Sequence, residues 1–194
     1  MEQKTNNTVN KYEKKIVTIP NILSFFRLCL IPVIVWLYSI DKNYVWAGYI
    51  LILSGITDMA DGYIARYFNM ISNFGKVLDP IADKLTQGVM LICLLLRFPM
   101  MIAPFVLLIV KEAFMGISGI LIIKRTRIVC GAQWHGKAAT CLLYGMMILH
   151  VFWHEITPLV SMISIVACTL MIGISFVLYG IRNIRIMKQA KENE

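Results

Sequence analysis

The sequence contains few charged residues. Asp, Glu, Lys and Arg make up 15% of its 194 residues, whereas a typical soluble domain has about 25%. Hydrophobic residues account for 58% of the chain, and the mean hydropathy is +0.70. This composition excludes an ordinary soluble globular domain and indicates a membrane protein.

Zinc-binding and redox motifs are missing as well. The five cysteines show no CxxC spacing, and the three histidines form no HExxH motif, although His150 and His154 are four residues apart; CxxC and HExxH are the patterns typical of sites built from these residues. Residues 1–21 contain lysines but no apolar stretch of their own. We therefore expect no cleavable secretory signal in this segment.

Long apolar runs dominate the rest of the chain. A spanning helix needs about 20 apolar residues, and the runs lack the polar–apolar alternation of a barrel strand. They predict an all-α membrane protein, a bundle of six transmembrane helices, the second extending to about Arg66. The six runs are Ile22–Ile40, Tyr44–Ile56, Val77–Leu96, Met100–Ile123, Ala138–Phe152 and Pro158–Ile181.

The two ends of the chain differ from this bundle. In residues 1–21, Ile16, Val17 and Ile19 precede Pro20, which predicts a short amphipathic segment at the membrane surface. Residues 22–181 form the predicted six-helix domain. Residues 182–194 are rich in Lys and Arg and are predicted to form a basic cytoplasmic tail.

Basic residues predict the orientation in the membrane. They gather at both termini and in the second and fourth loops, while the other loops carry only Lys42 and Arg97. Lys and Arg accumulate on the cytoplasmic side of membrane proteins. Both termini are therefore expected in the cytoplasm of a bacterial-type membrane. The net charge of +8 follows from this topology, so no nucleic-acid partner is needed to explain it.

Four aspartates interrupt the second and third apolar runs. An ionised Asp at the bilayer centre costs about 3 kcal/mol, so the group needs a compensating cation. Residues three and four apart share a helix face, so the two helices can present four carboxylates to one pocket. Hard oxygen ligands suit Mg²⁺, Mn²⁺ or Ca²⁺ and not zinc. The four are Asp58, Asp61, Asp79 and Asp83.

Small residues and one arginine accompany these aspartates. Gly62, Ala65 and Gly75 leave room for a ligand near the backbone. Arg66 has a guanidinium that can bind a diphosphate through two hydrogen bonds. Metal ligands, arginine and small residues together indicate a nucleotide-diphosphate site.

A proton relay or cation transporter is the alternative, because such proteins also place Asp within the membrane. In that case the aspartates would serve as relay groups or pair with Lys84 or Lys111. A relay has no use for an arginine and small residues at these spacings. Acidic residues would also recur in both halves of a repeat transporter, but the second half has only Glu112 and Glu155 before the tail. The pattern favours an enzyme.

The spacing of these eight residues resembles the signature of the CDP-alcohol phosphatidyltransferase family. The resemblance implies a six-helix bundle, usually a homodimer, that uses Mg²⁺ or Mn²⁺ at a two-metal site. Such enzymes transfer a phosphatidyl or phosphoalcohol group from a CDP-linked donor to a hydroxyl acceptor and release CMP. The stretch from Ile19 to Arg27 is similar to the branch that makes phosphatidylglycerophosphate or cardiolipin from CDP-diacylglycerol. The signature reads Asp58-x-x-Asp61-Gly62-x-x-Ala65-Arg66-x₈-Gly75-x₃-Asp79-x₃-Asp83.

The resemblance also implies a role for each signature residue. Asp58, Asp61 and Asp79 would ligate metal on the donor diphosphate, which makes Asp79 part of the catalytic machinery. Asp83 would complete the second metal shell and act as general base on the acceptor hydroxyl. The residues implied to receive the CDP donor are Gly62, Ala65, Arg66 and Gly75, with Asn21 and Arg27 from the N-terminal stretch.

Two acceptors compete, glycerol 3-phosphate and phosphatidylglycerol. The glycerophosphate-using branch has Ala-Arg-Glu in its fourth helix and a second Arg seven residues after the Glu. Here Lys111 and Gly119 stand at the two arginine positions, which favours phosphatidylglycerol. The stretch from Gly136 to Thr140 also resembles the fifth-helix entry of cardiolipin synthases. Basic candidates for an acceptor phosphate site are Lys111, Lys124, Arg125, Arg127 and Lys137, although topology alone explains the last four.

Overall fold

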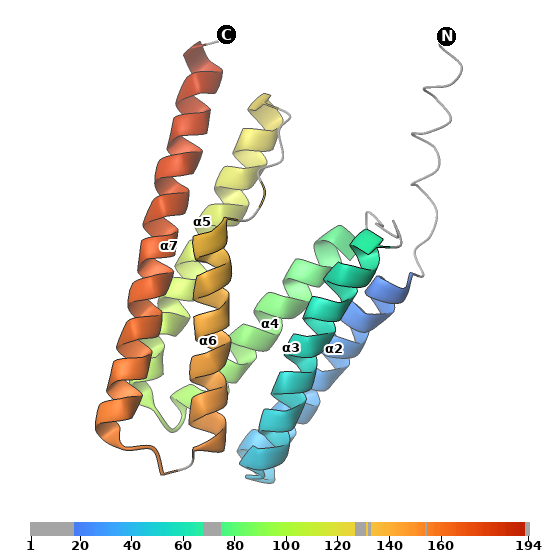
Figure 1. Cartoon of the computed structure of the whole chain (residues 1–194), viewed down its shortest axis with the longest axis vertical. Helices are drawn as coiled ribbons and strands as arrows, with labels where there is room; N and C mark the ends of the chain where they lie inside the picture. The colour runs from blue at the N-terminus through green and yellow to red at the C-terminus, as the bar shows by residue number, and fades with distance from the viewer. Residues whose placement is uncertain (1–17, 68–74, 127–130, 132, 154, 193–194) are drawn as a thin grey trace. The chain divides into compact units, whose positions relative to one another are not determined.

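The computed structural model describes residues 18–67, 75–126, 131, 133–153 and 155–192. These ranges contain six α-helices and no strand, which confirms the all-α class (Figure 1). The first residues of the predicted surface segment lie outside the described ranges. The helices are α2 (Ile19–Val35), α3 (Tyr44–Tyr67), α4 (Gly75–Leu95), α5 (Ile102–Thr126), α6 (Trp134–Phe152) and α7 (Pro158–Glu192).

Three helical segments among the described residues are long and apolar enough to cross a membrane. They are Pro20–Ile40, Pro99–Thr126 and Pro158–Ala190. The first joins α2 to a short π-helical segment, η2 (Trp36–Ile40), and the second includes a 3₁₀ turn, η3 (Pro99–Met101). Helices α3 and α4 carry the four aspartates, which lower their hydropathy. The prediction of six spans therefore stays a prediction.

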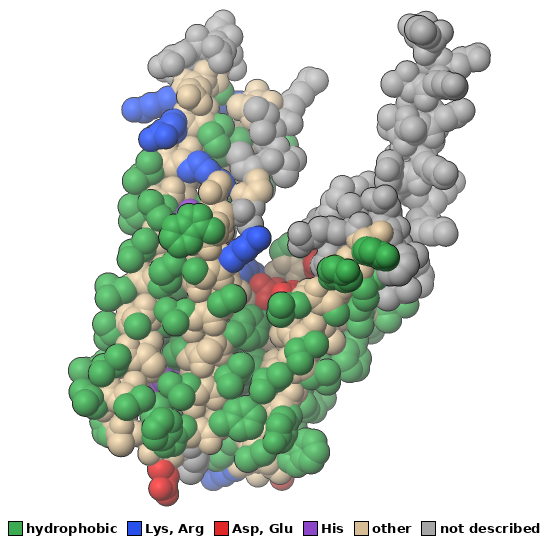
Figure 2. All heavy atoms as spheres, in the orientation of Figure 1, with side chains coloured by type: hydrophobic (Ala, Val, Ile, Leu, Met, Phe, Trp, Pro, Cys, Tyr) green, Lys and Arg blue, Asp and Glu red, His purple; other side chains and the backbone are tan. Residues whose placement is uncertain are grey.

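Apolar side chains cover much of the face shown in Figure 2. Many large hydrophobic residues are more than half exposed, among them Phe25, Trp46 and Ile117. In a soluble protein so much exposed apolar surface would be a liability. It fits helices whose outer faces contact lipid.

The chain divides into two compact units, Met1–Cys93 and Leu94–Glu194, and each is described by itself. In the first unit α2 runs antiparallel to α3. Arg27 of α2 lies beside Asp58 near the end of α3, and the rings of Tyr38 and Tyr44 meet edge to face at 5.0 Å at the opposite ends. Ile34 and Leu51 are buried between these contacts.

Helix α4 lies parallel to α2. Ser24, in the second turn of α2, donates to Asp79 near the start of α4. At the other end Ser39 contacts Cys93 with an Oγ–Sγ distance of 3.9 Å. Thr18 caps α2, because its hydroxyl accepts from the backbone N–H of Asn21. The hydrogen bond from Ser24 to Asp79 places the acidic start of α4 beside the start of α2.

The second unit packs α5 and α6 against α7. Phe114 of α5 meets Phe176 of α7 with ring centroids 5.3 Å apart, and Asn183 of α7 donates to Ser118 of α5 at 2.8 Å, so these helices run parallel. His150 near the end of α6 bonds Ser161 near the start of α7 at 2.9 Å. Helix α6 is therefore antiparallel to α7.

Helix α7 extends beyond the sixth predicted span. The sequence places the end of that span at Ile181, but the helix runs to Glu192. Most of the predicted basic tail, residues 182–194, is therefore a continuation of α7. At the other end of the chain, α2 begins at Ile19, three residues before the predicted span.

Candidate metal centre

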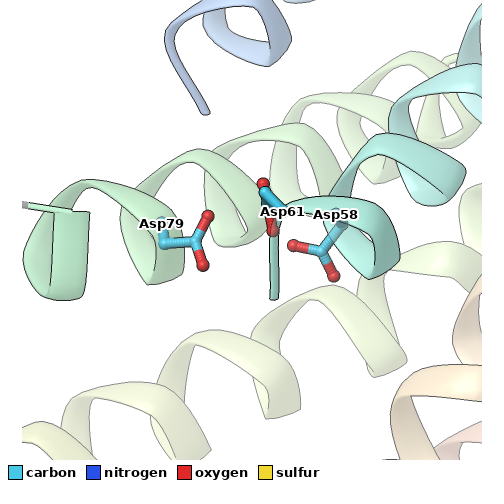
Figure 3. A group of neighbouring side chains, drawn as sticks. All are labelled: Asp58, Asp61 and Asp79. Carbon is cyan, nitrogen blue, oxygen red and sulfur yellow. The ribbon is translucent and has the colours of Figure 1, made fainter. Parts of the chain in front are cut away.

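Three carboxylates converge where α3 ends and α4 begins. One oxygen each of Asp58, Asp61 and Asp79 lies within 4.8 Å of the others, and Figure 3 shows the three side chains pointing toward one another. Asp58 and Asp61 share a face of α3 because they are three residues apart. The structure thus brings together three of the four predicted metal ligands.

Among the described residues, Arg27 is the cation that pairs with this cluster. Its side chain is completely buried, with Nη1 2.7 Å from Asp58 Oδ1 and 3.8 Å from Asp79 Oδ1. Its Nη2 pairs with Asp61 Oδ2. One guanidinium facing three carboxylates leaves an excess of negative charge when all three are ionised. The cluster is therefore suited to a further cation.

The oxygens of the cluster also fit a metal ion. Asp61 Oδ1 is buried and has no hydrogen-bond partner among the described residues. A buried polar atom without a partner costs about 1–3 kcal/mol, and more if it is charged. Asp79 Oδ1 accepts from Ser24 Oγ at 2.8 Å. Three carboxylates, one with an unpartnered oxygen, match the hard oxygen ligands that Mg²⁺ and Mn²⁺ prefer.

Asp83 is held separately, one turn after Asp79 on α4. Its Oδ1 accepts from Gln87 Nε2 at 2.8 Å, and its Oδ2 lies 3.2 Å from Lys84 Nζ. It is not one of the three converging carboxylates. The predicted fourth ligand therefore has a different environment from the other three.

The predicted donor residues flank the cluster along the chain. Gly62, Ala65 and Arg66 belong to the last turns of α3, and the side chains of Ala65 and Arg66 lie outside the description. Gly75 is the first residue of α4. Asn21 is buried in the first turn of α2.

The predicted acceptor candidates belong to the second unit and do not form one group. Lys111 is buried in α5, pairs with Glu112 at 2.9 Å and has its Nζ 6.0 Å from the ring centre of Tyr179. Lys124 and Arg125 are exposed in the last turn of α5. Lys111 and Lys124 are about 20 Å apart along the helix, at 1.5 Å per residue. Lys137 is exposed at the start of α6, and Arg127 lies outside the described residues.

Two residues of the acidic site were not predicted from the sequence. Ser24 binds Asp79, and the fully buried Gln87 binds Asp83. Ser24 lies three residues from both Asn21 and Arg27, so a helical reading of this stretch would have put it on their face. Gln87 is four residues after Asp83, so helical spacing also places these two residues on one face. A polar residue at that position of an apolar run could have identified it.

The fold and this site define a helical membrane protein with a buried carboxylate cluster that can hold a metal ion. The family model for CDP-alcohol phosphatidyltransferase matches residues 17–177. This match covers most of the chain and contains every helix that contributes to the cluster. The chain belongs to the CDP-alcohol phosphatidyltransferase family.

Curated relatives carry two kinds of name. A CDP-diacylglycerol–glycerol-3-phosphate 3-phosphatidyltransferase of Rickettsia bellii is 40% identical over 96 residues, 48% of this chain and 53% of that protein. A cardiolipin synthase (CMP-forming) of Streptomyces coelicolor is 43% identical over 76 residues, 37% of this chain and 35% of that protein. The match spans about half the length of the Rickettsia relative.

Proposed function

We propose that this chain is a membrane-bound phosphatidyltransferase. It transfers the phosphatidyl group from CDP-diacylglycerol to a glycerol-type hydroxyl and releases CMP, in the synthesis of anionic phospholipids. The observation that carries the proposal is the cluster of Asp58, Asp61 and Asp79 around Arg27. Its residues fall within the stretch matched by the family model.

In this proposal the carboxylates of α3 and α4 hold one or two Mg²⁺ or Mn²⁺ ions. The ions supply neutralisation of the diphosphate charge and stabilisation of the departing CMP. Arg27 faces the same carboxylates and supplies a guanidinium that can bind a phosphate oxygen. Gly62, Ala65, Arg66, Gly75 and Asn21 accommodate the CMP part of the donor.

Asp83 takes the proton of the acceptor hydroxyl. Its carboxylate has hydrogen-bond partners on its own helix and is not part of the three-carboxylate cluster. A positioned carboxylate beside a nucleophile contributes about 10²–10⁴-fold to the rate. The proposed division is that three aspartates mainly bind metal and the fourth mainly moves a proton.

Phosphatidylglycerol is the favoured acceptor, which would make the product cardiolipin. Glycerol 3-phosphate carries a dianionic phosphate and needs concentrated positive charge. Lys111, the candidate at the position expected for arginine, is paired with Glu112 at 2.9 Å. This pairing reduces the charge available to a dianion. Glycerol 3-phosphate remains the alternative, because relatives with both kinds of name match.

Separate reactions with each acceptor test this assignment. Purified protein is incubated with labelled CDP-diacylglycerol and Mn²⁺, with either glycerol 3-phosphate or phosphatidylglycerol, and the lipid products are separated. We expect cardiolipin and CMP only when phosphatidylglycerol is added, and no product in EDTA. Phosphatidylglycerophosphate formed from glycerol 3-phosphate alone would establish the alternative acceptor.

A cation or proton transporter is the alternative of another class, and ligand binding separates it from the enzyme. A ligand that binds only the folded state raises its stability. Mn²⁺ and CDP-diacylglycerol together should therefore raise the midpoint of thermal unfolding. No shift with either ligand would favour the transporter.

A further inference from the structure

Gln87 is a fully buried polar residue in the interior of α4 (Gly75–Leu95). Its Nε2 donates to Asp83 Oδ1 at 2.8 Å, and its Oε1 accepts from Lys84 Nζ at 3.4 Å. Burying an amide in an apolar region is costly unless its groups are hydrogen-bonded. Both ends of this amide have a partner, and one of those partners is the proposed general base.

The chemistry of the three groups fixes the direction of the amide. A carboxylate only accepts hydrogen bonds, and a lysine ammonium only donates them. The NH₂ group of Gln87 must therefore face Asp83, and its carbonyl faces Lys84. Lys84 also lies 3.2 Å from the second oxygen of Asp83. Each oxygen of the Asp83 carboxylate thus has a partner from α4 itself.

These contacts restrict rotation of the Asp83 carboxylate. Each carboxylate oxygen can accept two hydrogen bonds, so the contact with Gln87 or Lys84 does not by itself saturate an oxygen. Of the two partners, the Lys84 side chain is 32% exposed and has a long flexible stem, whereas Gln87 is enclosed. Gln87 is the partner that can hold a single orientation.

We infer that Gln87 is a positioning residue that orients the Asp83 carboxylate toward the acceptor hydroxyl. This inference rests on the proposed function, in which Asp83 accepts the proton of the acceptor. Gln87 does not contact the three carboxylates that converge near Arg27. Its loss should therefore slow the transfer step and leave binding of the donor and metal intact.

The test compares Gln87→Met with a matched control on the same helix. Methionine has about the length of glutamine but cannot donate to Asp83. Thr86→Val also removes a buried polar group, because Thr86 is 1% exposed and its hydroxyl donates to the backbone carbonyl of Ala82. Both purified proteins are assayed with CDP-diacylglycerol, Mn²⁺ and the acceptor that supports turnover in the unmodified protein.

We expect kcat of Gln87→Met to fall about 10- to 100-fold, the range expected for a misplaced reacting group. Its KM for CDP-diacylglycerol should change less than about twofold. The rise in unfolding midpoint produced by Mn²⁺ with CDP-diacylglycerol should equal that of the unmodified protein. Thr86→Val should keep kcat within about twofold.

Two outcomes would overturn the inference. One is a kcat of Gln87→Met close to that of the unmodified protein, and the other is an equal loss in Thr86→Val, which would show a general effect on the helix. If Gln87→Met does not fold, Gln87→Leu replaces it, because leucine also cannot donate to Asp83. Asp83→Asn distinguishes the two proposals. If Asp83→Asn keeps its turnover, the proposed role of Asp83 itself is contradicted. If Asp83→Asn loses turnover while Gln87→Met stays active, only the positioning role of Gln87 is overturned.

Discussion

At the scale of single residues, the central feature is one buried arginine facing three carboxylates. Removing one partner from a buried charged group leaves the others uncompensated, which typically costs about 3–5 kcal/mol. Arg27 is completely buried and contacts Asp58, Asp61 and Asp79. The charge balance of the site therefore depends on Arg27 and on any bound cation.

Arg27→Gln should lower the free energy of unfolding by about 3–5 kcal/mol when no divalent ion is present, because the carboxylates lose their counter-charge. Mn²⁺ should restore part of that loss by supplying positive charge to the same oxygens. Thermal unfolding with and without Mn²⁺ measures both effects. Arg185→Gln, at an exposed position of α7, is the control and should change little. A loss in Arg27→Gln that Mn²⁺ does not reduce would contradict binding of the ion among these carboxylates.

Asp83→Asn should reduce kcat by about 10²–10⁴-fold, since asparagine cannot accept the proton of the acceptor. Stabilisation by Mn²⁺ with CDP-diacylglycerol should persist, because the three converging carboxylates are unchanged. Steady-state kinetics and thermal unfolding of the same preparation give both quantities. If donor stabilisation disappears along with turnover, Asp83 is mainly a ligand and not a base.

The sequence predicted part of this site and could not predict the rest. Helical spacing alone places Asp58 beside Asp61 and pairs Asp79 with Asp83 one turn on. It cannot show that Arg27, distant in the sequence, enters the cluster, because that depends on how α2 packs against α3. Nor can it show that Asp83 bonds Gln87, since side-chain rotamers decide that contact.

At the scale of helices, the apolar runs predicted the element boundaries within a few residues, except at the start of α6 and the end of α7. Helix α7 continues eleven residues past Ile181 because the basic residues there end the apolar run without ending the helix. Lys, Arg, Met and Gln are good helix formers, so a change in hydropathy marked a membrane boundary and not a helix end.

The contact between α6 and α7 gives a test of helix packing. A Cβ at Gly136 would overlap the hydroxyl of Tyr179 and lie 3.0 Å from a ring carbon. That hydroxyl accepts from the backbone N–H of Gln133 at 2.9 Å. Gly136→Ala should therefore cost about 1–3 kcal/mol of stability through overpacking, measured as a lower unfolding midpoint.

Gly145→Ala on the same helix is the matched control. A Cβ there meets nothing within 4 Å among the described residues. Alanine is also favoured over glycine in a helix interior by about 1 kcal/mol. Gly145→Ala should therefore leave the stability of the protein unchanged or raise it slightly. Equal destabilisation of both variants would contradict the close approach of Gly136 to Tyr179.

At the scale of the whole molecule, the distribution of basic residues predicts the orientation in the membrane. We expect the loop at Lys42 outside and the end of α7 in the cytoplasm. To test this orientation, Lys42→Cys and Lys188→Cys are introduced separately into a chain whose native cysteines are replaced. Labelling with a membrane-impermeant thiol reagent then shows on which side of the membrane each position lies. Lys42→Cys should react in intact cells and Lys188→Cys only after lysis. The reverse pattern would place the site on the opposite side.

The most direct measurement is CMP release from CDP-diacylglycerol by purified protein with Mn²⁺ and phosphatidylglycerol, comparing the unmodified chain with Asp61→Asn. Asp61 combines a fully buried carboxylate, the pair with Arg27 and an oxygen without a hydrogen-bond partner among the described residues. We expect metal-dependent release of CMP that EDTA abolishes and that Asp61→Asn lacks. Turnover by Asp61→Asn close to that of the unmodified chain, or release that persists in EDTA, would contradict this expectation.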